Sequence, residues 1–127
     1  MSRVLDASAL LALFLEEPGS ARVISVIEAG AAIIAVNLAE VVTRSIDLGL
    51  DIEPLRERLS NFQIAVYAFD SAQAWQAALL RPATRTAGLS LGDRACLALA
   101  RELKLPALTA DRSWARLSLD IDIEVIR

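Results

Sequence analysis

The chain has 127 residues, which suits one domain over residues 1–127 with a core of its own. Hydrophobic residues make up 55% of it, enough to exclude a disordered chain, and the net charge of −3 argues against binding nucleic acid through bulk positive charge. Because histidine is absent, the usual histidine-ligated zinc sites and all Ser-His or Cys-His catalytic arrangements are excluded.

Short apolar runs with strand character alternate with helical patterns along the chain. Strands are expected over residues 2–5, 31–36, 64–69, 105–109 and 121–126. Helices are expected over residues 7–15, 21–28, 37–48, 52–60, 70–80, 90–103 and 111–117, with Ser20 as the N-cap of the second helix and a loop over residues 81–88. This alternation predicts an α/β fold in which helices cover both faces of a parallel sheet.

Five acids stand where a strand gives way to a helix or where a helix begins: Asp6, Glu40, Asp70, Asp93 and Asp111. Each has an ordinary structural explanation, because acids stabilise the first turn of a helix. The segments 37–40 and 90–93 both have the form of capping boxes, whereas Asp70 and Asp111 look like plain N-caps.

The five acids as a set point to a second interpretation. Helices that follow parallel strands begin at the same edge of a sheet, so several of these carboxylates should converge and repel one another. A divalent cation relieves that repulsion, and hard cations such as Mg²⁺ prefer oxygen ligands. The sequence has no Gly-rich phosphate loop and no cysteine cage that would compete for this role.

Four segments of the chain closely resemble motifs of the PIN-domain ribonucleases, and among these the VapC-type toxins of type II toxin–antitoxin systems. The segments are residues 4–11 (VLDASALL), 37–41 (NLAEV), 89–95 (LSLGDRA) and 108–114 (LTADRSW), and the resemblance covers essentially the whole chain. It implies a PIN-like three-layer α/β/α fold whose five-stranded parallel sheet has the order 3-2-1-4-5. Ligands bind such sheets at the switch point, here between strands one and four, so Asp70 at the sheet edge is left as a cap.

The resemblance also implies roles for individual residues. The family's catalytic acids correspond to Asp6, Glu40, Asp93 and Asp111, of which Asp6, Asp93 and Asp111 would bind metal and Glu40 would help to position the attacking water. Supporting polar residues are Ser8, Asn37 and Thr109, although each is explained equally well by a helix start or a strand end. Four arginines near the predicted site are candidates for contact with the RNA backbone, with solvated surface charge as the alternative: Arg81, Arg85, Arg94 and Arg112.

The function implied by the resemblance is that of an endoribonuclease toxin that depends on Mg²⁺ or Mn²⁺. Metal-activated water would hydrolyse an RNA phosphodiester and leave a 5′-phosphate and a 3′-hydroxyl. The implied partners are the RNA substrate, a VapB-like antitoxin and a second copy of the chain in a homodimer. A cytoplasmic location without membrane contact is expected, because the sequence shows neither a signal peptide nor a membrane-length apolar run.

Two other functions remain open from the residues. A phosphotransfer or phosphatase-type α/β domain also places an Asp after its first strand, but position 8 is Ser where that phosphatase pattern has a second Asp. A catalytically silent PIN-fold binding module would need none of the acids. Both Trp75 and Trp114 are expected to be packing residues rather than platforms for stacked bases.

Overall fold

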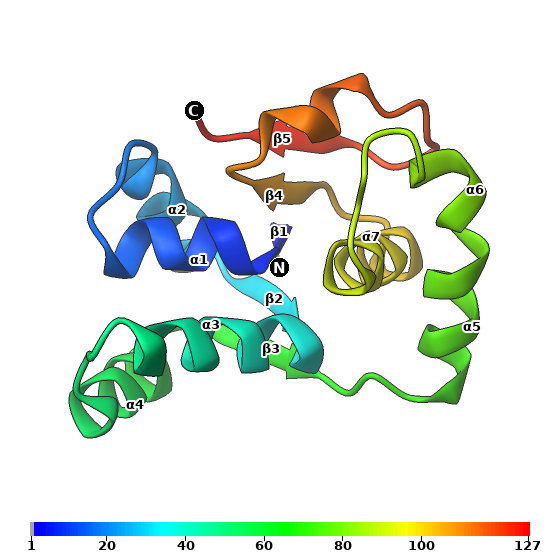
Figure 1. Ribbon diagram of the computed structural model, residues 1–127. Helices are drawn as coiled ribbons and strands as arrows, with labels where there is room; N and C mark the ends of the chain where they lie inside the picture. The colour runs from blue at the N-terminus through cyan, green and yellow to red at the C-terminus, as the bar shows by residue number, and fades with distance from the viewer. Residues whose placement is uncertain (1) are drawn as a thin grey trace.

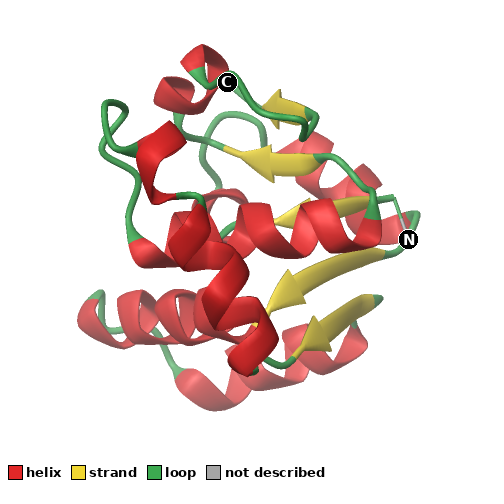
Figure 2. Ribbon diagram, turned by 90° about the vertical axis from the view of Figure 1, so that its right-hand side faces the viewer, coloured by secondary structure: helices red, strands yellow, loops and turns green. Residues whose placement is uncertain are grey.

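The structure is a computed structural model that describes residues 2–127. Its centre is a sheet of five parallel strands with the order β3-β2-β1-β4-β5, which confirms the predicted order. The strands are β1 (Arg3–Leu5), β2 (Ala31–Ile34), β3 (Ile64–Tyr67), β4 (Ala107–Thr109) and β5 (Ile123–Val125). All strands end at the same edge of the sheet, where their arrowheads lie in Figure 2.

Helices cover both faces of the sheet, as predicted (Figure 1). One face carries α1 (Ala7–Phe14), α2 (Ser20–Glu28), α3 (Ala35–Asp47) and α4 (Ile52–Asn61). The other carries α5 (Ser71–Leu79), α6 (Arg81–Thr84) and α7 (Leu91–Leu103), and a 3₁₀ helix, η1 (Arg112–Arg116), follows β4. Over residues 2–127, no helix is both long and apolar enough to cross a membrane.

The alternation of side chains along the strands divides the core between these two layers. Leu5 and Leu108 face the α1–α3 side, whereas Val4 and Ala107 face α7, and all four are fully buried. Because both faces of the sheet are covered, the central strands are continuously apolar rather than alternating with polar residues. The core therefore fixes the register of β1 and β4, on which the site described below depends.

Some predicted boundaries are wrong. The third helix begins at Ala35 rather than Asn37, so Ile34 occupies the N-cap position and Asn37 lies inside the first turn. Gly19, with φ of 97°, occupies the N-cap position of α2 in place of Ser20. Part of the predicted loop 81–88 is helical, because Pro82 fits the first turn of α6.

The two tryptophans differ in environment. Trp114 on η1 is buried at 1% exposure, which confirms it as a packing residue. Trp75 on α5 is 70% exposed, so it is not the packing residue within this chain that was expected. The sequence showed a helix at Trp75 but not which of its faces meets the sheet.

Candidate metal centre

Asp6 lies at the end of β1 and at the start of α1. Its side chain is the N-cap of α1, with Oδ1 accepting a hydrogen bond from the backbone N of Ala9 at 2.8 Å. Its own backbone N donates to the carbonyl of Leu108 in β4 at 3.1 Å. Asp6 is only 2% exposed. The structure therefore places this carboxylate between the ends of β1 and β4, at the predicted switch point.

Two hydroxyl groups hold the Asp6 carboxylate. Ser8 Oγ lies 2.8 Å from Oδ1 and 2.9 Å from Oδ2, and Thr109 Oγ1 donates to Oδ2. Each hydroxyl also accepts a backbone hydrogen bond, Ser8 from Ala110 N at 2.9 Å and Thr109 from Asp111 N at 3.0 Å. Since these bonds occupy acceptor positions, both hydroxyl hydrogens are left for the carboxylate. Ser8 and Thr109 thus orient Asp6.

The environment of Asp6 disfavours its negative charge. Burial raises the pKa of its carboxyl from the ordinary 3.8 to about 6, although hydrogen bonds from Thr109, Ala9 and Ser8 act in the opposite direction. The negative charge of Asp93 raises this pKa further. In the described part of the chain, the salt bridges involve neither of these two acids nor Glu40 or Asp111. Asp6 is therefore a buried carboxylate that forms no salt bridge with a cationic side chain of residues 2–127.

Glu40 is held at the junction of α3 and α7. Asn37, 1% exposed, donates from Nδ2 to Glu40 Oε1 at 2.7 Å and to the carbonyl oxygen of Gly92 at 3.0 Å. These bonds join the first turn of α3 to the first turn of α7, where Asp93 directly follows Gly92. The structure therefore replaces the predicted capping role of Asn37 with a link between two helix starts.

Asp93 has the capping role that the sequence predicted. Its Oδ2 accepts from the backbone N of Ser90 at 2.9 Å, and Ser90 Oγ accepts from Asp93 N at 3.2 Å, which completes a capping box. The capping role does not separate Asp93 from the other acids. Asp6, Asp93 and Glu40, together with burial as the larger cause, raise the pKa of the buried Cys96 thiol on α7 well above its usual value. Three of the four predicted acids thus add negative charge to the surroundings of the same buried thiol.

Asp111 and Asp70 are more peripheral. Asp111 is exposed and caps η1, with Oδ1 accepting from Ser113 N at 2.9 Å, and its link to Asp6 runs through the backbone and Thr109. Asp70 caps α5 by accepting from Gln73 N at 2.9 Å, beyond the edge strand β3, as expected for a plain cap. Residues 2–127 contain no compact group of three carboxylate or thiol side chains ready to surround a metal ion.

The donors nevertheless fit a hard divalent cation. They are all oxygen atoms, the Asp6 and Asp93 charges repel each other, and within the described chain buried Asp6 has no salt-bridge partner. Mg²⁺ is commonly bound through one or two carboxylates, with water and substrate phosphate completing its ligands. Such an ion needs fewer protein ligands than a compact cage provides.

The candidate arginines divide into two groups. Arg94 is half-buried and donates from Nη1 to the carbonyl of Ala77 at 3.0 Å, so it joins α7 to α5. Arg112 donates from Nε to the carbonyl of Arg127 at 3.0 Å. Arg81 and Arg85 are exposed on and after α6, and Arg81 makes a single weak contact with Leu89 O at 3.4 Å. Arg81 and Arg85 are therefore the exposed arginines of the four that the rest of the protein holds least.

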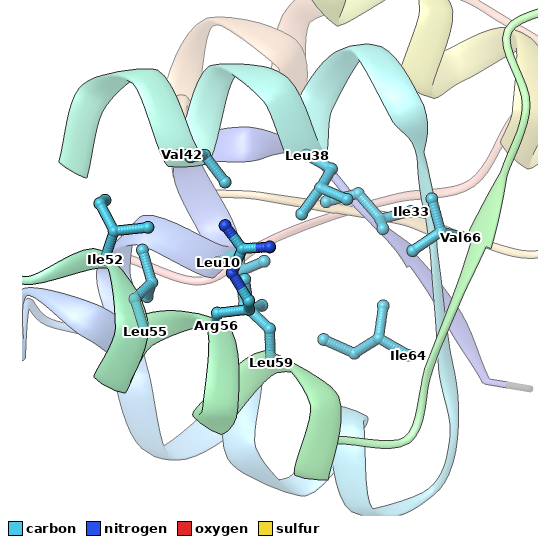
Figure 3. Close-up of a pocket in the computed structure, with 10 residues that line it drawn as sticks. All are labelled: Leu10, Ile33, Leu38, Val42, Ile52, Leu55, Arg56, Leu59, Ile64 and Val66. Carbon is cyan, nitrogen blue, oxygen red and sulfur yellow. The ribbon is translucent and has the colours of Figure 1, made fainter. Parts of the chain in front are cut away.

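An apolar groove lies on the α1–α4 face of the protein. Its volume is about 360 Å³, and Figure 3 shows the Arg56 side chain lying among its apolar side chains. The lining residues come from α1, β2, α3, α4 and β3: Leu10, Ile33, Leu38, Val42, Ile52, Leu55, Arg56, Leu59, Ile64 and Val66. A second hollow, between α1, α2 and the end of α4, is lined in part by Leu13, Ile27 and Phe62. The sequence signal was the apolar stripe of α4, which Leu55 and Leu59 carry.

Comparison with known proteins gives the following matches. The family model of the PIN domain matches residues 3–119. No curated protein sequence matches significantly. Similar solved structures include a toxin–antitoxin complex from Klebsiella pneumoniae, with 22% identity, coverage of 91% of this chain and 92% of that one, and a TM-score of 0.70. Another is VapC20 of Mycobacterium tuberculosis, a sarcin–ricin loop cleaving toxin, with 18% identity, 92% and 97% coverage, and a TM-score of 0.74. DNA-bound VapBC from Salmonella typhimurium has 16% identity, full coverage of both chains and a TM-score of 0.73.

Proposed function

Since this chain belongs to the PIN-domain family, we propose that it is a Mg²⁺-dependent endoribonuclease and the toxin of a toxin–antitoxin pair. One observation carries the proposal. The Asp6 carboxylate is buried at the switch point, is oriented by Ser8 and Thr109, and forms no salt bridge with a cation of residues 2–127, so a bound divalent cation would balance its charge. Membership of the PIN-domain family argues against a phosphotransfer or phosphatase-type domain. A catalytically silent PIN-fold binding module is the competing interpretation.

Asp6 and Asp93 are the residues that would hold the ion, with Asp111 as a further ligand. Mn²⁺ would be accepted in place of Mg²⁺, since both prefer carboxylate and water oxygens. When bound, the cation lowers the pKa of water and stabilises negative charge on the phosphate oxygens. The hydroxyls of Ser8 and Thr109 keep the Asp6 carboxylate in one orientation before the ion arrives, which limits the reorganisation on binding.

Glu40 and the arginines have different roles in the proposed reaction. Glu40 is exposed at the rim of the site and fixed by Asn37, so it can accept a proton from the attacking water. Water adds to phosphorus, the bond from phosphorus to the 3′-oxygen breaks, and the 3′-oxygen takes up a proton from solvent. The products are a 5′-phosphate and a 3′-hydroxyl. Arg81 and Arg85 would contact the RNA backbone.

A cleavage assay tests the enzymatic part of this proposal. End-labelled transfer RNAs and ribosomal RNA hairpins are incubated with the purified protein in Mg²⁺, Mn²⁺ or EDTA. We expect cleavage in either metal, none in EDTA, and none with Asp6→Asn or Asp93→Asn. If the wild-type protein binds these RNAs but cleaves them in neither metal, the result supports a catalytically silent binding module. Cleavage that survives EDTA or Asp6→Asn contradicts the metal-nuclease proposal.

The proposed antitoxin partner would occupy the apolar groove beside α4. The similar structures include toxin–antitoxin complexes, and the groove exposes apolar side chains together with the Arg56 guanidinium. Expression of the chain should arrest growth, and co-expression of its cognate antitoxin should relieve the arrest. Arg56→Glu should keep the arrest but weaken the relief, because the charge facing the partner is reversed. Equal relief of the wild type and of Arg56→Glu would contradict this use of the groove.

A homodimer is also part of the proposal. Trp75 and Leu79 lie one turn apart on α5 and are 70% and 65% exposed, a large apolar area for a free surface. The segment Ser71–Leu79 carries no charged residue. A two-fold interface packs each surface against its own copy, so an uncharged face avoids like-charge repulsion there. These features support α5 as the contact between two copies.

A further inference from the structure

We infer that Gly92 is a positioning residue whose missing side chain makes room for the Glu40 carboxylate beside Asp93. The inference rests on the proposed function, because it assigns Gly92 a part in arranging the acids of that site. Gly92 lies within the segment 89–95 (LSLGDRA), but the sequence assigned it no role. Its only local signal is an isolated glycine in the first turn of a helix that is otherwise rich in Ala and Leu.

Space, rather than backbone conformation, requires the glycine at this position. The glycines with positive φ in the described chain are Gly19, Gly30, Gly49 and Gly88, whereas Gly92 lies in ordinary α-helix. A Cβ atom built on Gly92 would lie 2.8 Å from both Cδ and Oε2 of Glu40, and closer still to Oε1. Real Cβ atoms essentially never make contacts this short, so with any side chain at position 92 either Glu40 or α7 must move.

Asn37 limits where the displaced carboxylate can go. Its buried Nδ2 donates to both Glu40 Oε1 and the Gly92 carbonyl, and two acceptor partners fix the orientation of the amide. Glu40 therefore cannot retreat along α3 without breaking its bond to Asn37. The one open direction is outward, because Glu40 is exposed to solvent on its other side. A side chain at position 92 would thus turn the carboxylate away from the site without requiring the protein to unfold.

The close approach also sets the spacing of two acids. Gly92 immediately precedes Asp93, so the same contact that presses α7 against Glu40 brings Asp93 to the rim that Glu40 occupies. A Cβ at position 92 would either push α7 outward, carrying Asp93 with it, or push Glu40 outward. In both cases the separation of the two carboxylates changes. RNA bound mainly through arginines would be little affected.

Steady-state cleavage of a labelled RNA tests the positioning role. For Gly92→Ala we expect kcat to fall about 10- to 100-fold, the scale of a misplaced catalytic group, with KM for RNA unchanged. Glu40→Asp shortens the side chain and should slow the wild type, yet speed up the Gly92→Ala protein, because the shorter carboxylate leaves room for the Cβ. The matched control is Gly49→Asn, where a Cβ meets nothing within 4 Å and Asn tolerates the positive φ, and its kinetics should equal those of the wild type.

Thermal unfolding of the same variants tests the contact independently of cleavage. Replacing a helical Gly by Ala ordinarily stabilises a protein, so Gly92→Ala should raise Tm by a few degrees in a Glu40→Ala background. In the presence of Glu40 it should leave Tm unchanged or lower it. If the wild-type protein did not cleave RNA, the proposed function would be contradicted. The Tm values of the four variants with and without Glu40 and the Gly92 substitution would still measure the contact between the two residues. The inference is overturned if Gly92→Ala raises Tm equally in both backgrounds, or if it cleaves RNA at the wild-type rate.

Discussion

Thr109 and Asp6, 103 positions apart in the sequence, are joined by a hydrogen bond from Oγ1 to Oδ2 across the ends of β4 and β1. The same hydroxyl accepts from the backbone N of Asp111, so one threonine connects two of the predicted catalytic acids. The bond is fully buried. It makes the orientation of the Asp6 carboxylate depend on the pairing of the two central strands.

Thr109→Val should therefore weaken both the fold and the site. Valine keeps the volume of threonine but removes the donor to Asp6 and leaves the Asp111 N–H without its acceptor. We expect the free energy of unfolding to fall by about 1–3 kcal/mol and cleavage to slow. Urea denaturation measures the first effect. Thr86→Val, at an exposed position, is the control and should change stability by less than about 0.5 kcal/mol. Equal stabilities of the two variants would contradict the role of the hydroxyl.

The pH dependence of stability should report on Asp6. Its folded pKa of about 6 lies above its ordinary value of 3.8, so the folded state binds more protons than the unfolded state between these values. Asp6 thus favours the fold below pH 4, and this contribution is lost as pH rises through about 6. In EDTA at pH 7.5, the free energy of unfolding of Asp6→Asn should exceed that of the wild type by up to about 3 kcal/mol, because the folded pKa of Asp6 lies about two units above its unfolded pKa. Near pH 4 the two proteins should have similar stability. If the stabilities of the two proteins changed in parallel with pH over this range, burial would not raise the pKa of Asp6.

Divalent cations should remove most of the difference in stability between Asp6→Asn and the wild type at pH 7.5. An ion that binds the folded state alone stabilises it by about 2.7 kcal/mol at 100 times its dissociation constant. Adding Mg²⁺ or Mn²⁺ at pH 7.5 should therefore raise the Tm of wild type, and EDTA should reverse the rise. Asp6→Asn and Asp93→Asn should respond little, since each lacks one proposed ligand. A similar rise in all three proteins would mean that the ion binds elsewhere.

Asp70 and Asp93 provide a comparison between a structural acid and a proposed catalytic one. Both belong to helix caps. Asp70→Ala should cost about 1 kcal/mol of stability through loss of the cap to Gln73 N, while RNA cleavage continues at the wild-type rate. Asp93→Asn keeps an oxygen that can accept from Ser90 N, so it should stay folded and lose cleavage. Loss of cleavage in Asp70→Ala with the fold intact would contradict the separation of the two acids.

Self-association should depend on α5. Sedimentation velocity is expected to show a dimer for the wild type and a monomer for Trp75→Glu, because two-fold packing would bring the new charges of both copies together. Ser60→Glu, on the exposed surface of α4, is the control and should remain dimeric. A monomeric wild type, or a dimeric Trp75→Glu, would contradict α5 as the interface.

The sequence by itself determined the alternation of strands and helices, the capping roles of Asp70 and Asp93, and, through the resemblance of its motifs, the strand order. These features follow from residues close together in the chain, where hydrophobic period and capping chemistry act locally. Only the tertiary structure decided that Asn37 links two helices, that Trp75 is exposed, that burial raises the pKa of Asp6, and that a Cβ at Gly92 would collide with the Glu40 carboxylate. The physical reason is that burial and contact depend on neighbours distant in sequence: Asn37 and Gly92 are 55 positions apart, and only the packing of α3 against α7 brings them together.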